Sequence, residues 1–254
     1  MQIATIVPTA YLNLVAEDDY HLCLIQELRK RGPYYEFYWN KAKEGKFVIV
    51  DNGAAEGETS CIEEILSFTM EMQATELQLP DFFFDGMETL KAVEKALKYL
   101  SEYNYKGKVM AIPQGKDIED WTLCLNEMLK FPEVTTLGIP KNLVFLGGAL
   151  ARVQAVRLLI EYKENGGRPI DLHLLGCWTT PKEVGVINTY YGHGVRGVDS
   201  GIASIYTQGG EVLEDGVDKP GGNKKYLDFD GIDLDEALLK DNIQRWRDYV
   251  NGIL

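Results

Sequence analysis

Short apolar runs alternate along this chain with longer segments whose apolar residues recur every three or four positions. The first pattern is typical of a buried strand, and the second of a helix with one face in a core. Phe47–Val50 is apolar throughout, whereas the segment 87–103 carries Leu90, Val93 and Leu97 at helical spacing. The pattern predicts strands at 3–7, 47–50, 76–79, 108–112, 135–139, 171–175 and 195–199.

Strands and helices alternate at intervals of about 30 residues, which indicates βαβ units and a parallel sheet. We therefore expect an α/β fold, a TIM-type (β/α)8 barrel that is either complete or has one strand irregular or missing. The segment 20–31 is predicted to be a helix, and an eighth strand either lies in 202–206 or is absent. A doubly wound open sheet is disfavoured, because polar or turn residues end nearly every strand and no single Gly-rich phosphate loop is present.

The domain prediction is a single unit over 1–254, with the barrel in 1–206 and C-terminal loops and a helix in 207–254. The net charge of −13 argues against non-specific binding to nucleic acid, which depends on Lys and Arg. No uninterrupted apolar stretch is long enough for a membrane span, and no secretory leader is visible at the start of the sequence. The expected location is the cytoplasm.

No metal site or cofactor is predicted, because the cysteines are widely spaced and none has a His at zinc-ligand spacing. The candidate chemistry lies at the strand ends. Asp51 and Asp199 each follow an apolar run, and two carboxylates at the mouth of a barrel can serve as nucleophile and acid/base in sugar chemistry. Asp81 and Gln114 also follow strands, and together they complement the hydrogen-bonding edge of a purine-like base.

Structural roles for the same residues remain open at this point. An Asp at a strand end is often the N-cap of the next helix. Asp81 and Asp85 could therefore cap the helix that starts near Gly86, and Asp51 could hold a turn. His173, between two leucines, is predicted to have a structural role in the core.

Several of these segments resemble the tRNA-guanine transglycosylase (queuine tRNA-ribosyltransferase) superfamily, and most closely its short bacteriophage members, which act on 7-deazaguanines and DNA. The resemblance covers about residues 1–205. It is carried by Val50-Asp51-Asn52-Gly53, Leu79-Pro80-Asp81, Ile112-Pro113-Gln114-Gly115, Leu137-Gly138-Ile139-Pro140 and Arg196-Gly197-Val198-Asp199-Ser200, together with 3–9 and 174–176. It implies a TIM barrel that exchanges guanine for a 7-deazaguanine base through a covalent aspartyl–(deoxy)ribose intermediate.

In this resemblance Asp199 is the nucleophile and Asp51 the acid/base. The base-binding positions are Asp81, Gln114, Gly115, Asn52 and Gly138. No Cys follows Cys177, so the zinc site of the tRNA enzymes is missing, and their basic extensions are missing as well. Both departures favour a substrate other than tRNA, which is consistent with the DNA-directed members.

The expected partners are a 7-deazaguanine base and DNA, the latter delivered with a partner protein or held by a small basic surface around Lys219, Lys224 and Lys225. Phe82, Phe83, Phe84 and Trp178 are candidates to stack on the base. The alternatives are the same exchange on tRNA or a free nucleoside or nucleotide, and an inert barrel that binds a modified base or a partner subunit.

Overall fold

Eight parallel strands form one sheet in the computed structural model, which describes residues 1–254 except 58–59, 178–179, 218–228 and 230. The sheet order is β1-β8-β7-β6-β5-β4-β3-β2. The strands are β1 (Gln2–Thr5), β2 (Tyr20–Cys23), β3 (Phe47–Val50), β4 (Glu76–Gln78), β5 (Lys108–Ala111), β6 (Thr136–Pro140), β7 (Asp171–Leu175) and β8 (Gly197–Ser200). β1 and β2 lie next to each other and nearly close the ring, without ladder pairing in the described sheet.

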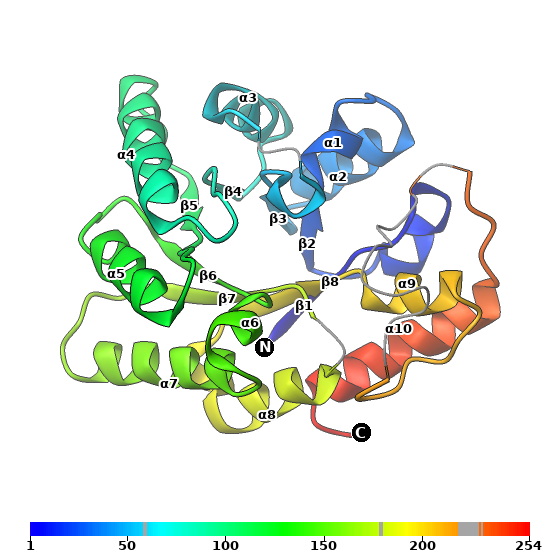
Figure 1. Cartoon of the computed structure of the whole chain (residues 1–254). Coiled ribbons are helices and arrows are strands. Elements are labelled where there is room, and N and C mark those ends of the chain that lie inside the picture. The colour runs from blue at the N-terminus through cyan, green and yellow to red at the C-terminus, as the bar shows by residue number, and fades with distance from the viewer. Residues whose placement is uncertain (58–59, 178–179, 218–228, 230) are drawn as a thin grey trace.

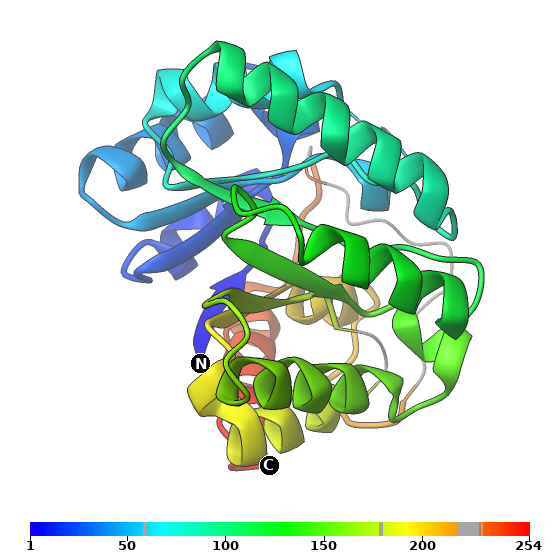
Figure 2. The same ribbon diagram turned by 90° about the vertical axis from the view of Figure 1, so that its left-hand side faces the viewer.

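Helices cover the outside of this ring of strands (Figure 1, and Figure 2 from the side). They are α1 (Ile25–Leu28), α2 (Pro33–Lys43), α3 (Ile62–Met72), α4 (Gly86–Glu102), α5 (Ile118–Met128), α6 (Leu143–Gly147), α7 (Ala151–Glu164), α8 (Pro181–Tyr191), α9 (Ile202–Gln208) and α10 (Glu236–Val250). In the described part of the chain, 3-10 turns span Thr9–Val15, Ala54–Glu56 and Gly192–Gly194. The predicted TIM-type (β/α)8 barrel is confirmed.

The eighth strand is β2, and it lies inside the segment that the sequence pattern predicted to be a helix. All four of its residues are buried, and Tyr20 and Cys23 pair in parallel with Phe47 and Val50. The prediction was wrong because four residues, three of them apolar or aromatic, do not show whether their period is that of a strand or a helix.

The other candidate for the eighth strand, 202–206, belongs to helix α9. It follows β8 after a single residue, Gly201, and the Ser200 hydroxyl accepts a hydrogen bond from the Ile202 amide at 3.1 Å. A parallel strand needs a crossover of a dozen or more residues, so a strand could not start here.

Helix α10 packs beside α8 and α9 and also contacts β1, so the C-terminal segment covers the outside of the barrel's first and last strands (Figure 1). Trp246 of this helix is completely buried. Gly185 of α8 permits the close approach, since a Cβ there would lie 2.3 Å from the carbonyl oxygen of Tyr249. In the described part of the chain, no helix has the length and apolar character needed to cross a membrane.

The bottom of the barrel interior is polar. Tyr20, Glu76 and Thr136 are the first residues of β2, β4 and β6, and Arg196 directly precedes β8. The side chains of Tyr20, Glu76 and Thr136 are buried. Alternate strands of a TIM barrel supply the side chains of one layer, and that layer is usually filled by branched apolar residues. Here a hydrogen-bonded polar layer takes their place.

Candidate active site

A cavity of about 560 Å³ lies at the carboxyl ends of the strands. This is the end of a TIM barrel where active sites are found, and the volume suits a small molecule. Its lining includes the polar residues Gln26, Glu27, Asp51, Asn52, Gln78, Asp81, Gln114, Lys141, Asn142, Asp199 and Ser200. Phe83, Phe84 and Phe145 stand at the same cavity and are exposed.

Asp81 is the centre of a buried hydrogen-bonded network at this cavity. Its Oδ1 accepts from Asn52 Nδ2 and its Oδ2 from Gln114 Nε2, both at 2.6 Å. Gln114 Oε1 accepts in turn from Asn142 Nδ2 at 3.4 Å, and Asn52 Oδ1 accepts from the Ala54 amide at 2.9 Å. These bonds fix which end of each amide is the donor. The loops after β3, β4, β5 and β6 are thereby joined through side chains.

The Asp81 carboxyl is 1% exposed, and burial raises its pKa from 3.8 to about 6. The hydrogen bonds from Asn52 and Gln114 act in the opposite direction, because they stabilise the ionised form. The helix-capping role considered for Asp81 is filled by Asp85 instead, whose Oδ1 accepts from the Glu88 amide at 2.9 Å. Asp81 therefore gains and loses its proton close to neutral pH inside the cavity.

Asp51 borders the same cavity from the end of β3 and is 7% exposed. Its Oδ2 accepts from the Gly53 amide at 2.9 Å, and Gly53 has a positive φ of 79°. Asp51 thus holds the turn that the sequence left open as an alternative, and it also faces the cavity that the catalytic prediction requires.

Asp199 approaches the cavity from β8, where it pairs in register with Ala4 of β1. Its Oδ1 lies 3.0 Å from Nε2 of His173 and accepts from the Gly176 amide at 3.3 Å. His173 is fully buried, with its other ring nitrogen 2.8 Å from the Tyr20 hydroxyl. His173 is thus a core residue, as predicted, and it also contacts Asp199 of the candidate site directly.

The two predicted glycines lie outside the lining of the cavity among the described residues. At Gly115 a Cβ would lie 2.2 Å from the Trp121 amide nitrogen, so this glycine lets the loop after Gln114 pack on α5. At Gly138, inside β6, a Cβ would lie 2.6 Å from a methyl carbon of Leu175. Both glycines have a packing role, and a base-binding role for them stays a prediction.

The sequence interpretation missed Lys141 and Asn142, which follow β6 and line the cavity. The Lys141 side chain lies over Gly176, where a Cβ would be 2.9 Å from its Cδ and 3.3 Å from its Nζ. The signal was available in Ile139-Pro140-Lys141-Asn142, another strand that ends in polar residues. Trp178 and the predicted basic surface at Lys219, Lys224 and Lys225 lie outside the described residues.

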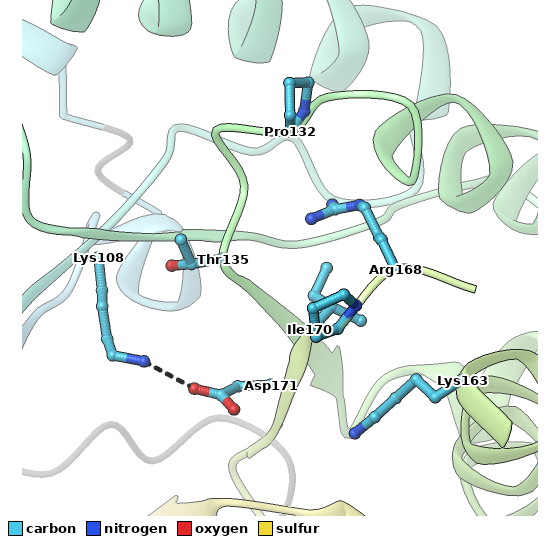
Figure 3. Close-up of a pocket in the computed structure, with 8 residues that line it drawn as sticks. Lys108, Pro132, Thr135, Lys163, Arg168, Ile170 and Asp171 are labelled. Carbon is cyan, nitrogen blue, oxygen red and sulfur yellow. Dashed lines mark hydrogen bonds and ion pairs between the residues drawn. The ribbon is translucent and has the colours of Figure 1, made fainter. Parts of the chain in front are cut away.

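A second cavity, of about 290 Å³, lies at the opposite end of the barrel, below β5 to β7. Figure 3 shows Lys108 and Asp171 joined at one side of it, with Arg168 and Lys163 on the other. The Lys108 Nζ is 2.9 Å from Asp171 Oδ2, and Arg168 donates to the carbonyl oxygens of Leu129 and Val134. These cations have internal partners, which indicates a structural role. Over the described residues, no group of three or more His, Cys, Asp or Glu could hold a metal ion.

No protein-family model matches the chain, and no curated protein sequence matches it. Solved structures do resemble it. The carboxyl transferase domain of Rhizobium etli pyruvate carboxylase, solved with 3-bromopyruvate, aligns with a TM-score of 0.52 at 11% identity over 99% of this chain and 47% of that one. N-acetylneuraminate lyase from Mycoplasma synoviae gives 0.48 at 14% identity over 79% and 69%. CdNal from Clostridium difficile, solved with mannosamine, gives 0.44 at 10% over 76% and 62%.

The predicted membership of the tRNA-guanine transglycosylase superfamily is wrong. No family model supports it, and a solved structure that aligns with a TM-score of 0.52 is a carboxyl transferase domain. The predicted glycosyltransferase activity is therefore also wrong; it was a pentosyltransferase exchange of guanine for 7-deazaguanine in phage DNA. The two alternatives, the same exchange on tRNA or a nucleotide and an inert base-binding barrel, are not supported either. The matching motifs are two to five residues long at strand ends, where every parallel barrel needs turn and polar residues. At such low identity the solved structures show the barrel fold and no activity.

Proposed function

We propose that this chain is an enzyme that performs general acid–base chemistry of the lyase type on a small, uncharged polar molecule in the mouth of the barrel. The observation that carries the proposal is Asp81, a buried carboxyl with a pKa of about 6 in a cavity that Asp51 and Asp199 also border. A general acid or base is most effective when its pKa lies near the working pH. A perturbed carboxyl in a cleft is a candidate functional group for the same reason.

The charges around the cavity favour an uncharged substrate that is rich in hydroxyl or N–H donors. The described lining contains four acidic side chains, Glu27, Asp51, Asp81 and Asp199, and one cation, Lys141. Two or more negative charges on a ligand would meet this acidic lining unfavourably, whereas hydroxyl and N–H groups can donate to it. Lys141 can donate to a single carbonyl group of such a substrate.

Each side chain has a proposed role. Asp81, held by Asn52 and Gln114, binds donor groups of the substrate and buffers a proton. Asp199 lies in β8 and Asp51 directly follows β3, and both border the cavity, so one can remove a proton and the other return it. Apolar side chains also line the cavity around these groups, Leu22, Leu24 and Ile112 among them, and they lower the effective dielectric there.

A ligand screen tests the substrate class. Neutral sugars and polyols, neutral nitrogen heterocycles and polyphosphates are added to the protein, and thermal unfolding is followed. Neutral compounds should raise Tm, and Asp81→Asn should abolish the rise, while Asp241→Asn on the exposed face of α10 should preserve it. Compounds that bind are then incubated with the protein and followed by mass spectrometry for conversion. Stabilisation by polyphosphates alone, or by a ligand that Asp81→Asn still binds equally well, would contradict the proposal.

A more specific candidate is a lyase that uses a Schiff base on Lys141. The observation in its favour is that Lys141 lies over Gly176, whose amide donates to Asp199, so an amine and a carboxylate stand on the two sides of one residue. A lysine amine condenses with a carbonyl compound and loses water, and the resulting imine accepts the electrons of a carbon–carbon bond that breaks next to it. A carboxylate such as Asp199 can take the hydroxyl proton that this cleavage releases.

Reductive trapping tests this candidate. Small ketones, ketoacids and sugars are added together with borohydride, and the intact mass and peptide masses are measured. A mass increase located on Lys141 and missing from Lys141→Arg would support the Schiff base. Labelling of Lys46, a lysine outside the cavity, to the same extent would show non-specific reaction and remove the candidate.

A further inference from the structure

A hydrogen-bonded chain runs up the inside of the barrel from its polar bottom layer to the candidate site. Arg196 Nε donates to the Tyr20 hydroxyl at 3.1 Å, the hydroxyl lies 2.8 Å from His173 Nδ1, and His173 Nε2 lies 3.0 Å from Asp199 Oδ1. Tyr20 and Arg196 are 176 positions apart in the sequence, and His173 and Asp199 are 26 positions apart. Three strands, β2, β7 and β8, therefore have to be in register for this chain to form.

We infer that Arg196 and Tyr20 hold His173 as the neutral tautomer with its proton on Nε2, so that the ring donates to Asp199 Oδ1 and leaves Oδ2 for a ligand. That Asp199 acts on a substrate rests on the proposed function. The proton positions rest on the hydrogen bonds alone.

The assignment follows from counting protons. The Arg196 Nε is a donor only, so the Tyr20 oxygen must accept from it. The single hydroxyl proton of Tyr20 then has one acceptor within reach among the described residues, the Nδ1 of His173. If Nδ1 carried a proton instead, the buried hydroxyl proton would lack an acceptor, which is unfavourable for a buried polar group. With Nδ1 bare, the proton of a neutral ring is on Nε2, opposite the carboxylate.

Tyr20 is a reliable donor in this position, because burial raises the pKa of its hydroxyl well above the ordinary value of 10. The charged groups that face it are Arg196, Glu76 and Asp199, and they partly compensate one another. Gly197 leaves the room for its ring, since a Cβ there would lie 2.7 Å from a ring carbon of Tyr20. The Tyr20 ring of β2 therefore packs directly over Gly197 of β8, and this packing fixes its position.

Arg196 is anchored below Tyr20. Its Nη2 donates to Glu76 Oε2, and its Nη1 donates to Thr136 Oγ1 at 3.0 Å and to Asp171 Oδ2 at 3.1 Å. Asp171 is the same residue that pairs with Lys108 in Figure 3. The guanidinium therefore has little freedom to turn away from Tyr20, and the direction of every bond above it is set. Tyr20, His173 and Arg196 act on Asp199 as positioning residues.

At the top of the chain, Asp199 Oδ1 receives two donors, His173 Nε2 and the Gly176 amide. Among the described residues no donor reaches Oδ2, while Asp199 borders the cavity. A carboxylate held by one oxygen and open at the other has a defined direction of attack or proton transfer. Preorganisation of this kind is what supporting hydrogen bonds contribute to an active site.

The experiment is a two-bond proton–nitrogen correlation spectrum of the histidine rings in the full-length, nitrogen-15-labelled protein. The chain has three histidines, so His173→Gln assigns the signal. A bare Nδ1 and a protonated Nε2 are expected at neutral pH. Tyr20→Phe removes the donor to Nδ1 and should shift that nitrogen, while Tyr11→Phe, a buried tyrosine hydrogen-bonded to Leu234, should leave the ring unchanged.

A proton on Nδ1, a doubly protonated ring at neutral pH, or an unchanged ring in Tyr20→Phe would overturn the inference. Asp199→Asn is the second variant. The two donors select its amide oxygen, so the tautomer should persist, and a switch would show that Asp199 rather than Tyr20 sets it. None of these measurements uses a substrate, so their failure is distinct from failure of the proposed function. With a substrate in hand, Tyr20→Phe should lower kcat and leave KM near its original value.

Discussion

The amide of Gln114 donates to the buried carboxylate of Asp81 over 2.6 Å, although 33 residues separate them in sequence. The bond joins the loops that follow β4 and β5. It also opposes the effect of burial on Asp81, whose pKa is nevertheless raised to about 6. The hydrogen bond from Gln114 thus both joins two loops of the candidate site and affects the pKa of Asp81.

The first prediction concerns stability and pH. The folded-state pKa of Asp81 lies above its unfolded value of 3.8, so the folded protein binds this proton more tightly. The stability contributed by protonated Asp81 is complete below about pH 4 and is lost as the pH rises to about 6, by up to about 3 kcal/mol. Urea unfolding at a series of pH values should show this decline in the wild type and not in Asp81→Asn. Glu94→Gln, at an exposed position of α4, should keep it.

A second prediction separates the hydrogen bonds from the burial. Gln114→Met removes a donor to Asp81 while keeping the side chain about as long, so the pKa of Asp81 should rise further. A carbon-13 NMR titration of the Asp81 carboxyl measures this directly. Gln154→Met, on the exposed side of α7, is the matched control and should leave the Asp81 titration where it was. A lower pKa in Gln114→Met would mean that Gln114 does not stabilise the ionised carboxyl.

The third prediction concerns the polar bottom layer. Arg196→Met leaves the fully buried Glu76 without its charged partner and should lower the free energy of unfolding by about 3–5 kcal/mol. The double variant Arg196→Met with Glu76→Gln should be more stable than Arg196→Met alone, because it removes the uncompensated charge. Arg245→Met breaks an exposed pair with Asp241 and should change stability by less than about 1 kcal/mol. If Arg196→Met and Arg245→Met lower the free energy of unfolding by the same amount, the effect does not come from a buried charge.

The fourth prediction concerns Gly115. A Cβ there would lie 2.2 Å from the Trp121 backbone nitrogen, and backbone cannot move aside as a flexible side chain can. Gly115→Ala should therefore destabilise the protein by at least about 1–3 kcal/mol and displace the loop that carries Gln114. Thermal unfolding gives the first effect and the Asp81 titration the second. Gly32→Ala has nothing within 4 Å of the new Cβ and should be tolerated. If Gly115→Ala unfolds at the same temperature as the wild type, α5 does not pack on this loop.

The pattern of apolar runs was sufficient for seven strands and failed for β2. Phe47–Val50 and Asp171–Leu175 stand out because turn residues bound them and helices separate them from the next strand. Tyr20–Cys23 runs on into Ile25 and Leu28, so its spacing also fits a helix. The pairing with β3 makes it a strand, and a partner 27 residues away is not visible in a local pattern.

Candidate site residues were found where each follows a strand, as with Asp51, Asp81 and Gln114. The family resemblance built on the same short segments was misleading, because strand ends of parallel barrels look alike. Lys141 was overlooked although it follows a strand in the same way. Position at a strand end therefore predicts that a residue reaches the mouth of the barrel, and says little about the reaction there.

The sequence by itself determined the barrel class and the end of the barrel at which polar residues gather, since both follow from the order and spacing of apolar runs. Only the tertiary structure decided which residues act together. His173 between two leucines is, by its neighbours in sequence, an ordinary core residue. The closing of the sheet places it between Tyr20 and Asp199. Hydrogen-bond geometry depends on distances across strands, and those distances exist only once the barrel has formed.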